Sequence, residues 1–351
     1  MKSTLSLLPL IGALALPATA NAAKIALDGD SWIMPGGYIQ PWLQVPIDTD
    51  DGGVTPDFFI RRAFMFMGAK PTENTYVFLG GLASNLGKTG EANNTFNIID
   101  AWFEYRHSAA FNVDVGFFRV PFTRHHLVAG SKLHGLDFHT HYIKQSGVAS
   151  LRDVGIQLRG RLLDEHLEYR LAVLDGYEPN TLNAVPRVIA RATYHVFDSD
   201  KGLKVWGAHL GKKKYLSFAG AVDLEPSYGD SGDDMAWSAA ADVFADIPMG
   251  DNGVVATAVY QIHGPDGSMP EGMGVWGDVG YRIKLVEPLV AVEWYDAAAS
   301  DDVGERLAVL GGVNYWMKGH NFSIKAQVGA AQIDGADSWS TEAVVQSQFA
   351  F

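Results

Sequence analysis

Apolar and polar side chains alternate along most of this chain with a period of two residues. The alternation is clearest over residues 99–106, 153–161 and 167–173, where apolar side chains mostly alternate with charged or polar ones. This period is typical of a β-strand that has one apolar face and one polar face. The same rhythm continues to the end of the chain, which closes on Phe351.

The alternation predicts sixteen strands, an even number. Their spacing of about 20 residues is longer than the roughly 8–12 residues expected of a soluble β-sandwich, and it suits tilted strands of about ten residues that cross a membrane. The predicted strands are residues 32–44, 57–70, 74–84, 96–107, 111–120, 148–162, 165–175, 188–197, 214–225, 235–246, 253–263, 272–284, 287–297, 304–317, 320–333 and 339–351.

The connections between these strands alternate in length. Links after even-numbered strands are mostly tight, whereas links after odd-numbered strands are mostly longer and polar. Short turns on one rim and long loops on the other are typical of outer-membrane barrels. We therefore predict an all-β fold, a transmembrane antiparallel β-barrel of 16 strands whose polar face lines a water-filled interior. The alternative, a soluble sandwich, would bury the apolar faces against each other.

Two links differ from the others. The longest, residues 121–147, is the third of the long loops. The link 198–213 is long although it follows the eighth strand. The alternation assigns it to the rim of short turns, where we expect the run Lys212–Lys213–Lys214 to meet water or lipid headgroups.

The N-terminus reads as an export signal. Lys2 gives a positive start, Leu5–Leu16 form a short apolar core, and Ala20–Asn21–Ala22 provide small residues for cleavage. We therefore divide the chain into a signal peptide, 1–22, and one barrel domain, 23–351, that is exported through the periplasm to the bacterial outer membrane. The chain has no cysteine, which excludes disulfides and lipid attachment to cysteine. Its formal charge of -13 argues against nucleic acid as a partner.

Several short segments resemble motifs of the phosphate-selective porin family, O and P type. These segments are Phe59–Ala63, Gly116–Phe122, Arg152–Gly160 and Leu210–Leu216. The closing strand with Phe351 as its last residue likewise resembles the C-terminal signature of bacterial outer-membrane barrels, so Phe351 is expected to help close the barrel. The resemblance implies a homotrimeric porin that conducts anions, in some members phosphate, and whose third long loop folds inward. Implied partners are small anionic solutes, outer-membrane lipid and lipopolysaccharide, and the barrel-assembly machinery.

Cations gather where this resemblance places the narrowest part of the pore. Residues 119–147 contain four cations and only one acid, Asp137, although the whole chain is acidic. The cations are Arg119, Arg124, Lys132 and Lys144. A cationic constriction favours anions because a narrow water channel with low-dielectric walls focuses the field. The candidate selectivity residues are Arg61, Arg62, Arg119, Arg124, Lys132, Lys144, Arg159 and Arg161.

Two questions about these cations stay open at this stage. They could form an anion track, or they could be held in wall salt bridges with acids of the predicted strands, Asp100, Glu104, Asp153 and Glu168. Adjacent residues of a regular strand point to opposite faces, so Arg61 and Arg62 cannot both face the lumen. One of the two is therefore expected at a bulge, a rim or a subunit contact.

Histidines are concentrated in the same loop: His125, His126, His134, His139 and His141. Unperturbed histidines would add positive charge below about pH 6.5 and make conductance pH-dependent. His139 and His141 have a spacing that metal ligands sometimes show, but a metal site needs three or four converging ligands, so we assign no metal.

We predict no cofactor and no enzymatic activity, since the chain has no nucleophile-elbow, phosphate-cradling or metal-binding helix motif. The predicted function is passive diffusion of small hydrophilic solutes with a preference for anions such as phosphate. The alternatives are a barrel-embedded hydrolase and a non-conducting structural barrel. A serine within hydrogen-bond reach of a histidine that also meets a carboxylate would favour the hydrolase.

Overall fold

The computed structural model describes residues 24–47, 55–91, 95–139, 151–176, 185–228, 234–265, 271–297, 306–333 and 339–351. Residues 1–22, predicted as a signal peptide, lie outside the described residues, as do His141 and Lys144.

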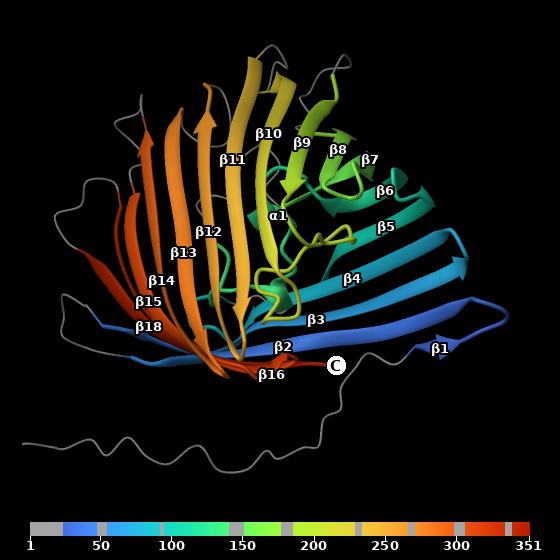
Figure 1. Ribbon diagram of the computed structural model, residues 1–351. Helices are drawn as coiled ribbons and strands as arrows, with labels where there is room; N and C mark the ends of the chain where they lie inside the picture. Colours follow the sequence, from blue (N-terminus) through green and yellow to red (C-terminus); the bar gives the residue numbers. More distant parts are fainter. Residues whose placement is uncertain are drawn as a thin grey trace, which may run out of the picture.

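Sixteen long strands form one antiparallel sheet that closes into a barrel (Figure 1). Each strand pairs with its neighbours along the chain, and β18 pairs with β2 to complete the ring. The strands are β2 (Trp32–Pro46), β3 (Asp57–Thr72), β4 (Thr75–Leu86), β5 (Asn97–Ser108), β6 (Phe111–Arg119), β7 (Arg152–Leu162), β8 (Leu167–Leu174), β9 (Arg187–His195), β10 (Tyr215–Tyr228), β11 (Asp234–Met249), β12 (Asn252–His263), β13 (Gly272–Ile283), β14 (Val286–Ala297), β15 (Arg306–Tyr315), β17 (Phe322–Ile333) and β18 (Ser340–Ala350).

The predicted barrel of 16 strands is therefore confirmed, and each predicted strand overlaps one of these. Two short strands were not predicted: β1 (Ile25–Ala26), which pairs with β2, and β16 (Met317–His320), which lies in the turn before β17. No helix in the described residues is long and apolar enough to span a membrane.

Polar side chains point into the barrel and apolar side chains point out. On β7, Val154 and Ile156 are each 51% exposed, whereas Asp153 and Gln157, which flank them, are buried. The same inversion holds on β5, where Phe103 is exposed and Glu104 is buried. An apolar outer face and a polar inner face suit a barrel surrounded by lipid, and they exclude the alternative of two sheets packed through apolar faces.

A β-bulge explains the adjacent arginines of β3. Arg62 pairs with Gln40 and Ile60 pairs with Pro41, so Arg61 is an extra residue with no opposite partner on β2. Inserting one residue re-aims the side chains of a strand. Both Arg61 and Arg62 therefore reach the lumen. Of the three possibilities raised by the sequence, a bulge, a rim or a subunit contact, the structure shows the bulge.

The end of the chain completes the seam between β18 and β2. Phe351 N donates to Gly37 O and Gly37 N donates to Phe351 O, each at 3.0 Å. The Phe351 side chain is half exposed beside Met65 and Met67 on the outer wall. Phe351 thus extends the closing ladder by one residue beyond Ala350.

The loop between β6 and β7 folds into the barrel, as predicted. We call residues 120–151 the inward loop; its described part contains α1 (Arg124–Leu127) and a 3₁₀ turn, η1 (Gly130–Lys132). Figure 1 shows α1 inside the ring of strands. Gln348 Nε2 on β18 donates to Ser131 O at 3.0 Å, which ties the loop to the inner wall.

A second segment also enters the lumen, from the opposite rim. The link between β9 and β10, residues 196–214, is called the second insert here. Val128 of the inward loop bridges Val205 of the second insert, and Gly207 N donates to Lys132 O at 2.8 Å. The middle of this link therefore packs against the inward loop, whereas Lys212 and Lys214 of the predicted lysine run at its end are exposed.

Candidate functional site

The inward loop is fastened to the inner face of β13 and β14 by ion pairs. His134 Nδ1 lies 3.1 Å from Asp278 Oδ1, and His134 Nε2 lies 2.9 Å from Glu287 Oε1. His139 Nδ1 pairs with Glu293 on β14, and its ring stacks on Trp276 with centroids 4.5 Å apart. The cavity between the loop and β13 measures about 20 Å³, so the loop packs closely against this part of the wall.

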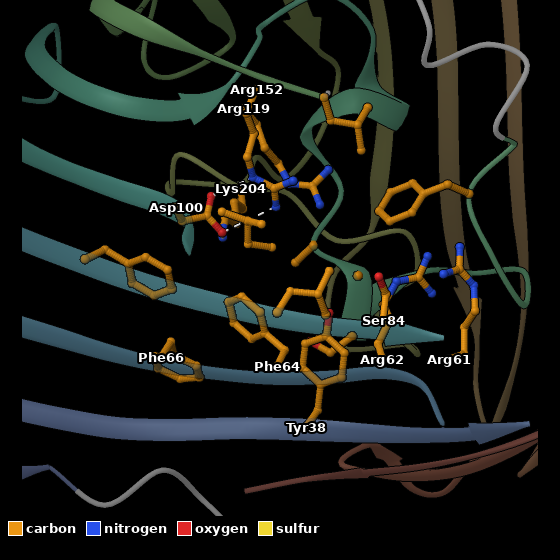
Figure 2. A pocket seen from close by; sticks show the side chains of 18 residues that line it. Tyr38, Arg61, Arg62, Phe64, Phe66, Ser84, Asp100, Arg119, Arg152 and Lys204 are labelled. Carbon is orange, nitrogen blue, oxygen red and sulfur yellow. Dashed lines mark hydrogen bonds and ion pairs between the residues drawn. The ribbon is translucent and has the colours of Figure 1, made fainter. Parts of the chain in front are cut away.

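A larger cavity, of about 350 Å³, lies between the two inserts and the inner face of β2–β7 (Figure 2). Its wall carries five cations and one described carboxylate, together with aromatic rings. We call this space the cationic cavity, and its charged lining residues are Arg61, Arg62, Arg119, Arg152, Lys204 and Asp100.

Two of these cations, Lys204 and Arg152, share a single carboxylate. Lys204 Nζ lies 2.7 Å from Asp100 Oδ2, and Arg152 Nε lies 3.1 Å from Asp100 Oδ1. Arg119 lies beside Arg152 and lines the same cavity (Figure 2). The group formed by Arg119, Arg152, Lys204 and Asp100 therefore carries a formal excess of positive charge.

Arg119 is the least neutralised of the group. Its guanidinium is 3% exposed, donates from one terminal nitrogen to His126 O at 2.8 Å, and lies 5.0 Å from the Phe138 ring. In the described part of the chain, Arg119 forms no ion pair with a carboxylate, and its Nε has no hydrogen-bond partner. A buried cation without a counter-ion is costly, and an anion in the cavity would offset that cost.

Arg61 and Arg62 are held by the single acid of the described loop. Arg61 Nε lies 2.8 Å from Asp137 Oδ2, and Arg62 pairs with Asp137 Oδ1. Burial raises the pKa of Asp137, but Arg62 and Arg61 outweigh burial and lower it to about 2. The carboxylate is therefore ionised at neutral pH, and the three residues together carry one net positive charge.

Lys204 stands between two cavities. It lines the cationic cavity and also a second cavity of about 650 Å³ that the second insert forms with the turn before β8. Burial, together with the nearby charges of Arg152 and Arg119, lowers the pKa of Lys204 to about 8 although Asp100 opposes the shift. The linings of the two cavities thus share Lys204.

Four predicted selectivity residues belong to cross-links instead. Arg124 is buried, with one terminal nitrogen 3.2 Å from Asp200 Oδ2 and 2.7 Å from Trp206 O. It joins the inward loop to the second insert. Lys132 lies with its Nζ 4.5 Å from the centre of the Trp206 ring.

Arg159 and Arg161 lie on β7 and follow the wall-network interpretation. Arg159 Nε lies 2.9 Å from Asp114 Oδ2, and its terminal nitrogen pairs with Glu104. Arg161 donates to Asp200 O at 3.3 Å, which fastens the second insert. Arg159 is therefore held in a wall salt bridge as the second interpretation expects, whereas Arg161 contacts the second insert.

The histidines of the inward loop have shifted pKa values. Burial lowers the pKa of His125 and of His126 well below 6.5. For His134 and His139, burial alone would lower the pKa, but Asp278 and Glu287 raise that of His134 to about 10, and Glu293 raises that of His139. We therefore expect none of these four to change charge near pH 6.5. Among the described residues, no three histidine or acidic side chains gather as a metal site.

Sequence reasoning missed two residues of the cationic cavity, Arg152 and Lys204. Arg152 was visible only as part of the Arg152–Gly160 motif, with no sign that it faces the lumen. Lys204 lies in the link that the alternation of link lengths assigned to a rim. A signal was present in the length of that link, which exceeds what a turn between adjacent strands needs.

One serine hydroxyl does approach a histidine. Ser238 on β11 and His263 on β12 are opposite one another, with Ser238 Oγ 2.8 Å from His263 Nδ1. Both side chains are buried, each 4% exposed, so the hydroxyl is not open to a substrate from the lumen. This pair lies in the barrel wall, away from the residues that line the cationic cavity.

A closed barrel of sixteen strands, apolar outside and polar inside, with a loop folded into its lumen, is the architecture of outer-membrane porins. The location predicted from the sequence, the bacterial outer membrane, agrees with this fold.

Solved structures of outer-membrane proteins are similar over almost the whole chain. OmpF of Salmonella typhi, in complex with daunomycin, has a TM-score of 0.67 at 13% identity over 94% of this chain and 100% of that chain. The outer-membrane channel DcaP of Acinetobacter baumannii has a TM-score of 0.60 at 12% identity, over 92% and 97% of the two chains. An anion-selective porin from Comamonas acidovorans has a TM-score of 0.59 at 10% identity, over 92% and 100%.

At these identities the likeness shows the fold alone. No family model matches the chain, and no curated protein matches it in sequence. The porin fold implied by the resemblance is therefore confirmed, whereas membership of the phosphate-selective O and P type family is not.

Proposed function

We propose that the protein is an outer-membrane porin through which small hydrophilic solutes diffuse passively, with a preference for anions. The observation that carries this proposal is the cationic cavity, whose lining shares Lys204 with that of a second cavity. Its charged lining has four more cations than carboxylates, and Asp137 behind Arg61 and Arg62 reduces the excess to three. An excess of fixed positive charge in a narrow aqueous channel attracts anions and repels cations.

Of the sequence-based candidates, Arg61, Arg62 and Arg119 line the cationic cavity, and we assign them to selectivity together with Arg152 and Lys204. Arg124, Arg159 and Arg161 are assigned to holding the inserts in place. Phosphate is one candidate solute. Cavities of about 350 and 650 Å³ beside the two inserts favour a conducting channel over a structural barrel.

Reversal potentials in planar bilayers test this proposal. Under a tenfold KCl gradient, the purified protein should give a potential whose sign reports chloride as the more permeant ion. A potential of the opposite sign would reject anion preference and leave the channel itself standing. Absence of conductance steps from folded, heat-modifiable protein would reject the channel.

The partners implied by the resemblance are also proposals: a homotrimer, contacts with outer-membrane lipid and lipopolysaccharide, and insertion by the barrel-assembly machinery. A groove on the outer wall, lined by apolar residues that include Met65, Leu79 and Phe96, offers one face for a second copy. Native mass spectrometry of the membrane-extracted protein should give three chains per particle. The same spectrum should show that residues 1–22 have been removed.

A further inference from the structure

Aromatic rings form a continuous row on the inner wall from the rim of short turns to the cationic cavity. The row runs over four adjacent strands, β2 to β5, and neighbouring ring centroids lie 5.2–6.0 Å apart. Its members are Tyr76, Trp102, Phe78, Phe66, Phe64 and Tyr38. The rings of Tyr38, Phe64, Phe66 and Phe78 line the cavity itself (Figure 2).

Such a row of aromatic rings is unexpected on the lumen-facing side of a barrel. Small anions gain little from the faces of apolar rings, and the lumen of a porin is normally lined by polar side chains. On the outer face of the same strand, Met65 and Met67 alternate with Phe64 and Phe66, so β3 is apolar on both faces over this stretch. The inner rings therefore favour a solute that has a flat apolar part.

The rings adjoin the cations directly. Lys204 Nζ lies 4.6 Å from the centre of the Phe78 ring and 5.7 Å from that of Phe64. Arg119, with its unpaired Nε and no carboxylate partner in the described residues, lines the same cavity from the opposite wall. An apolar surface and an anion-binding group thus occur within one cavity of about 350 Å³, a volume within the range of about 300–1,000 Å³ of small-molecule sites.

We propose that the cationic cavity binds aromatic carboxylates, with the carboxylate among Arg119, Arg152 and Lys204 and the ring against Phe64 and Phe78. This inference rests on the proposed porin function, since it names the class of solute that the channel passes. Guanidinium groups bind carboxylates in a bidentate manner, and offset or tilted ring stacking adds to burial of the aromatic ring.

Two other ligand classes fit less well. A neutral sugar can stack on aromatic rings, but it would leave the excess positive charge of Arg119, Arg152 and Lys204 uncompensated. Inorganic phosphate would compensate that charge, but it would leave the rings of Phe64 and Phe78 without a function. An aromatic carboxylate uses both features at once.

Binding to the folded barrel in detergent tests the inference independently of conductance. Titration calorimetry would compare benzoate with acetate, inorganic phosphate and glucose. Benzoate should bind about tenfold or more tightly than acetate, because only benzoate brings a ring to the aromatic wall. The double variant Phe64→Leu, Phe78→Leu should remove this advantage and leave acetate binding unchanged, and Arg119→Gln should weaken both carboxylates.

Phe103→Leu is the matched control, since Phe103 is exposed on the outer face of β5 and should not affect any of the four probes. Equal binding of benzoate and acetate, tighter binding of phosphate, or binding of glucose without benzoate would each overturn the inference. Benzoate binding by a barrel that shows no anion conductance would reject the proposed function alone. Anion conductance without benzoate preference would reject this inference alone.

Discussion

Lys204 and Asp100 join two segments that reach the centre of the barrel by different routes. Lys204 lies on the second insert, which enters from the rim of short turns, and its Nζ lies 2.7 Å from Asp100 Oδ2 on β5. Asp100 also pairs with Arg152, so the lysine is held beside an arginine and is only partly neutralised. This contact places a cation in the lining of both cavities.

Replacing Lys204 should reduce anion preference. Coulomb's law gives about 0.7 kcal/mol between unit charges about 6 Å apart in water, which corresponds to a factor of about three. We therefore expect Lys204→Gln to lower the chloride-to-potassium permeability ratio about threefold, measured from reversal potentials. Lys284→Gln, which removes the same charge from an exposed turn, should leave the ratio unchanged. Equal effects of the two variants would mean that selectivity reflects overall charge and not this cavity.

Anion preference should decline between about pH 7 and pH 9. Burial lowers the pKa of Lys204 and that of Lys132 to about 8, and Lys212 contributes to the shift of Lys132. Both amines therefore lose their positive charge as the pH rises through this range. Arg119 and Arg152 face Lys204 from β6 and β7, opposite Asp100 on β5.

The double variant Lys204→Arg, Lys132→Arg should flatten this dependence, because arginine stays charged throughout. Permeability ratios measured at intervals from pH 6 to pH 9 provide the test. A steep change centred near pH 6.5 instead would show that histidines control selectivity, against the pKa shifts of His125, His126, His134 and His139.

Asp137 should lower the preference for anions and hold the inward loop in place. Asp137→Asn removes the charge that neutralises Arg61 and Arg62, so the permeability ratio for chloride should rise while the loop is held less firmly. The pKa of Asp137 is about 2, below its unfolded value, so its contribution to stability is present at neutral pH and is lost only as the pH falls toward 2. Current noise should accordingly stay constant down to about pH 4 in the unmodified protein and be raised at all pH values in the variant. A fall in the chloride ratio would contradict this account.

A side chain added at Gly207 should disrupt the packing of the second insert against the inward loop. A Cβ there would lie 2.7 Å from both Lys132 O and His134 N, which are backbone atoms with little freedom to move. Gly207→Ala should therefore destabilise the folded barrel by about 1–3 kcal/mol. Gly311→Ala is the control, since a Cβ at Gly311 meets no atom within 4 Å. Urea unfolding followed by tryptophan fluorescence measures both, and equal stabilities would show that the inserts are loosely packed.

The strands were predictable because each one carries its own signal. Alternation of apolar and polar residues, such as Phe103 and Glu104, shows within a single strand which side chains point outward and which point inward. Sixteen such strands joined by links of alternating length define the barrel. The inward fold of the third loop came from the family resemblance and not from the residues.

The site was only partly predictable because its contacts join residues far apart in the chain. Asp137 lies more than 70 positions from Arg61, and Lys204 lies 104 positions from Asp100. Charge alone could not separate Arg119, which lines the cavity, from Arg159, which is held by Asp114 and Glu104. The link that carries Lys204 was assigned to a rim because a regular rhythm of link lengths says nothing about which way a link folds.

Thiol modification tests most directly whether anions pass along the cationic cavity, because the chain has no native cysteine. Ser84 lines the cavity, whereas Ser217 is buried on the inner face of β10. In single-channel recordings, Ser84→Cys should lose conductance on exposure to a negatively charged methanethiosulfonate, and more slowly with a positively charged one. Ser217→Cys should be unaffected by either. The account would be contradicted if Ser84→Cys kept its conductance while Ser217→Cys lost it. Faster modification of Ser84→Cys by the positively charged reagent than by the negatively charged one would also contradict it.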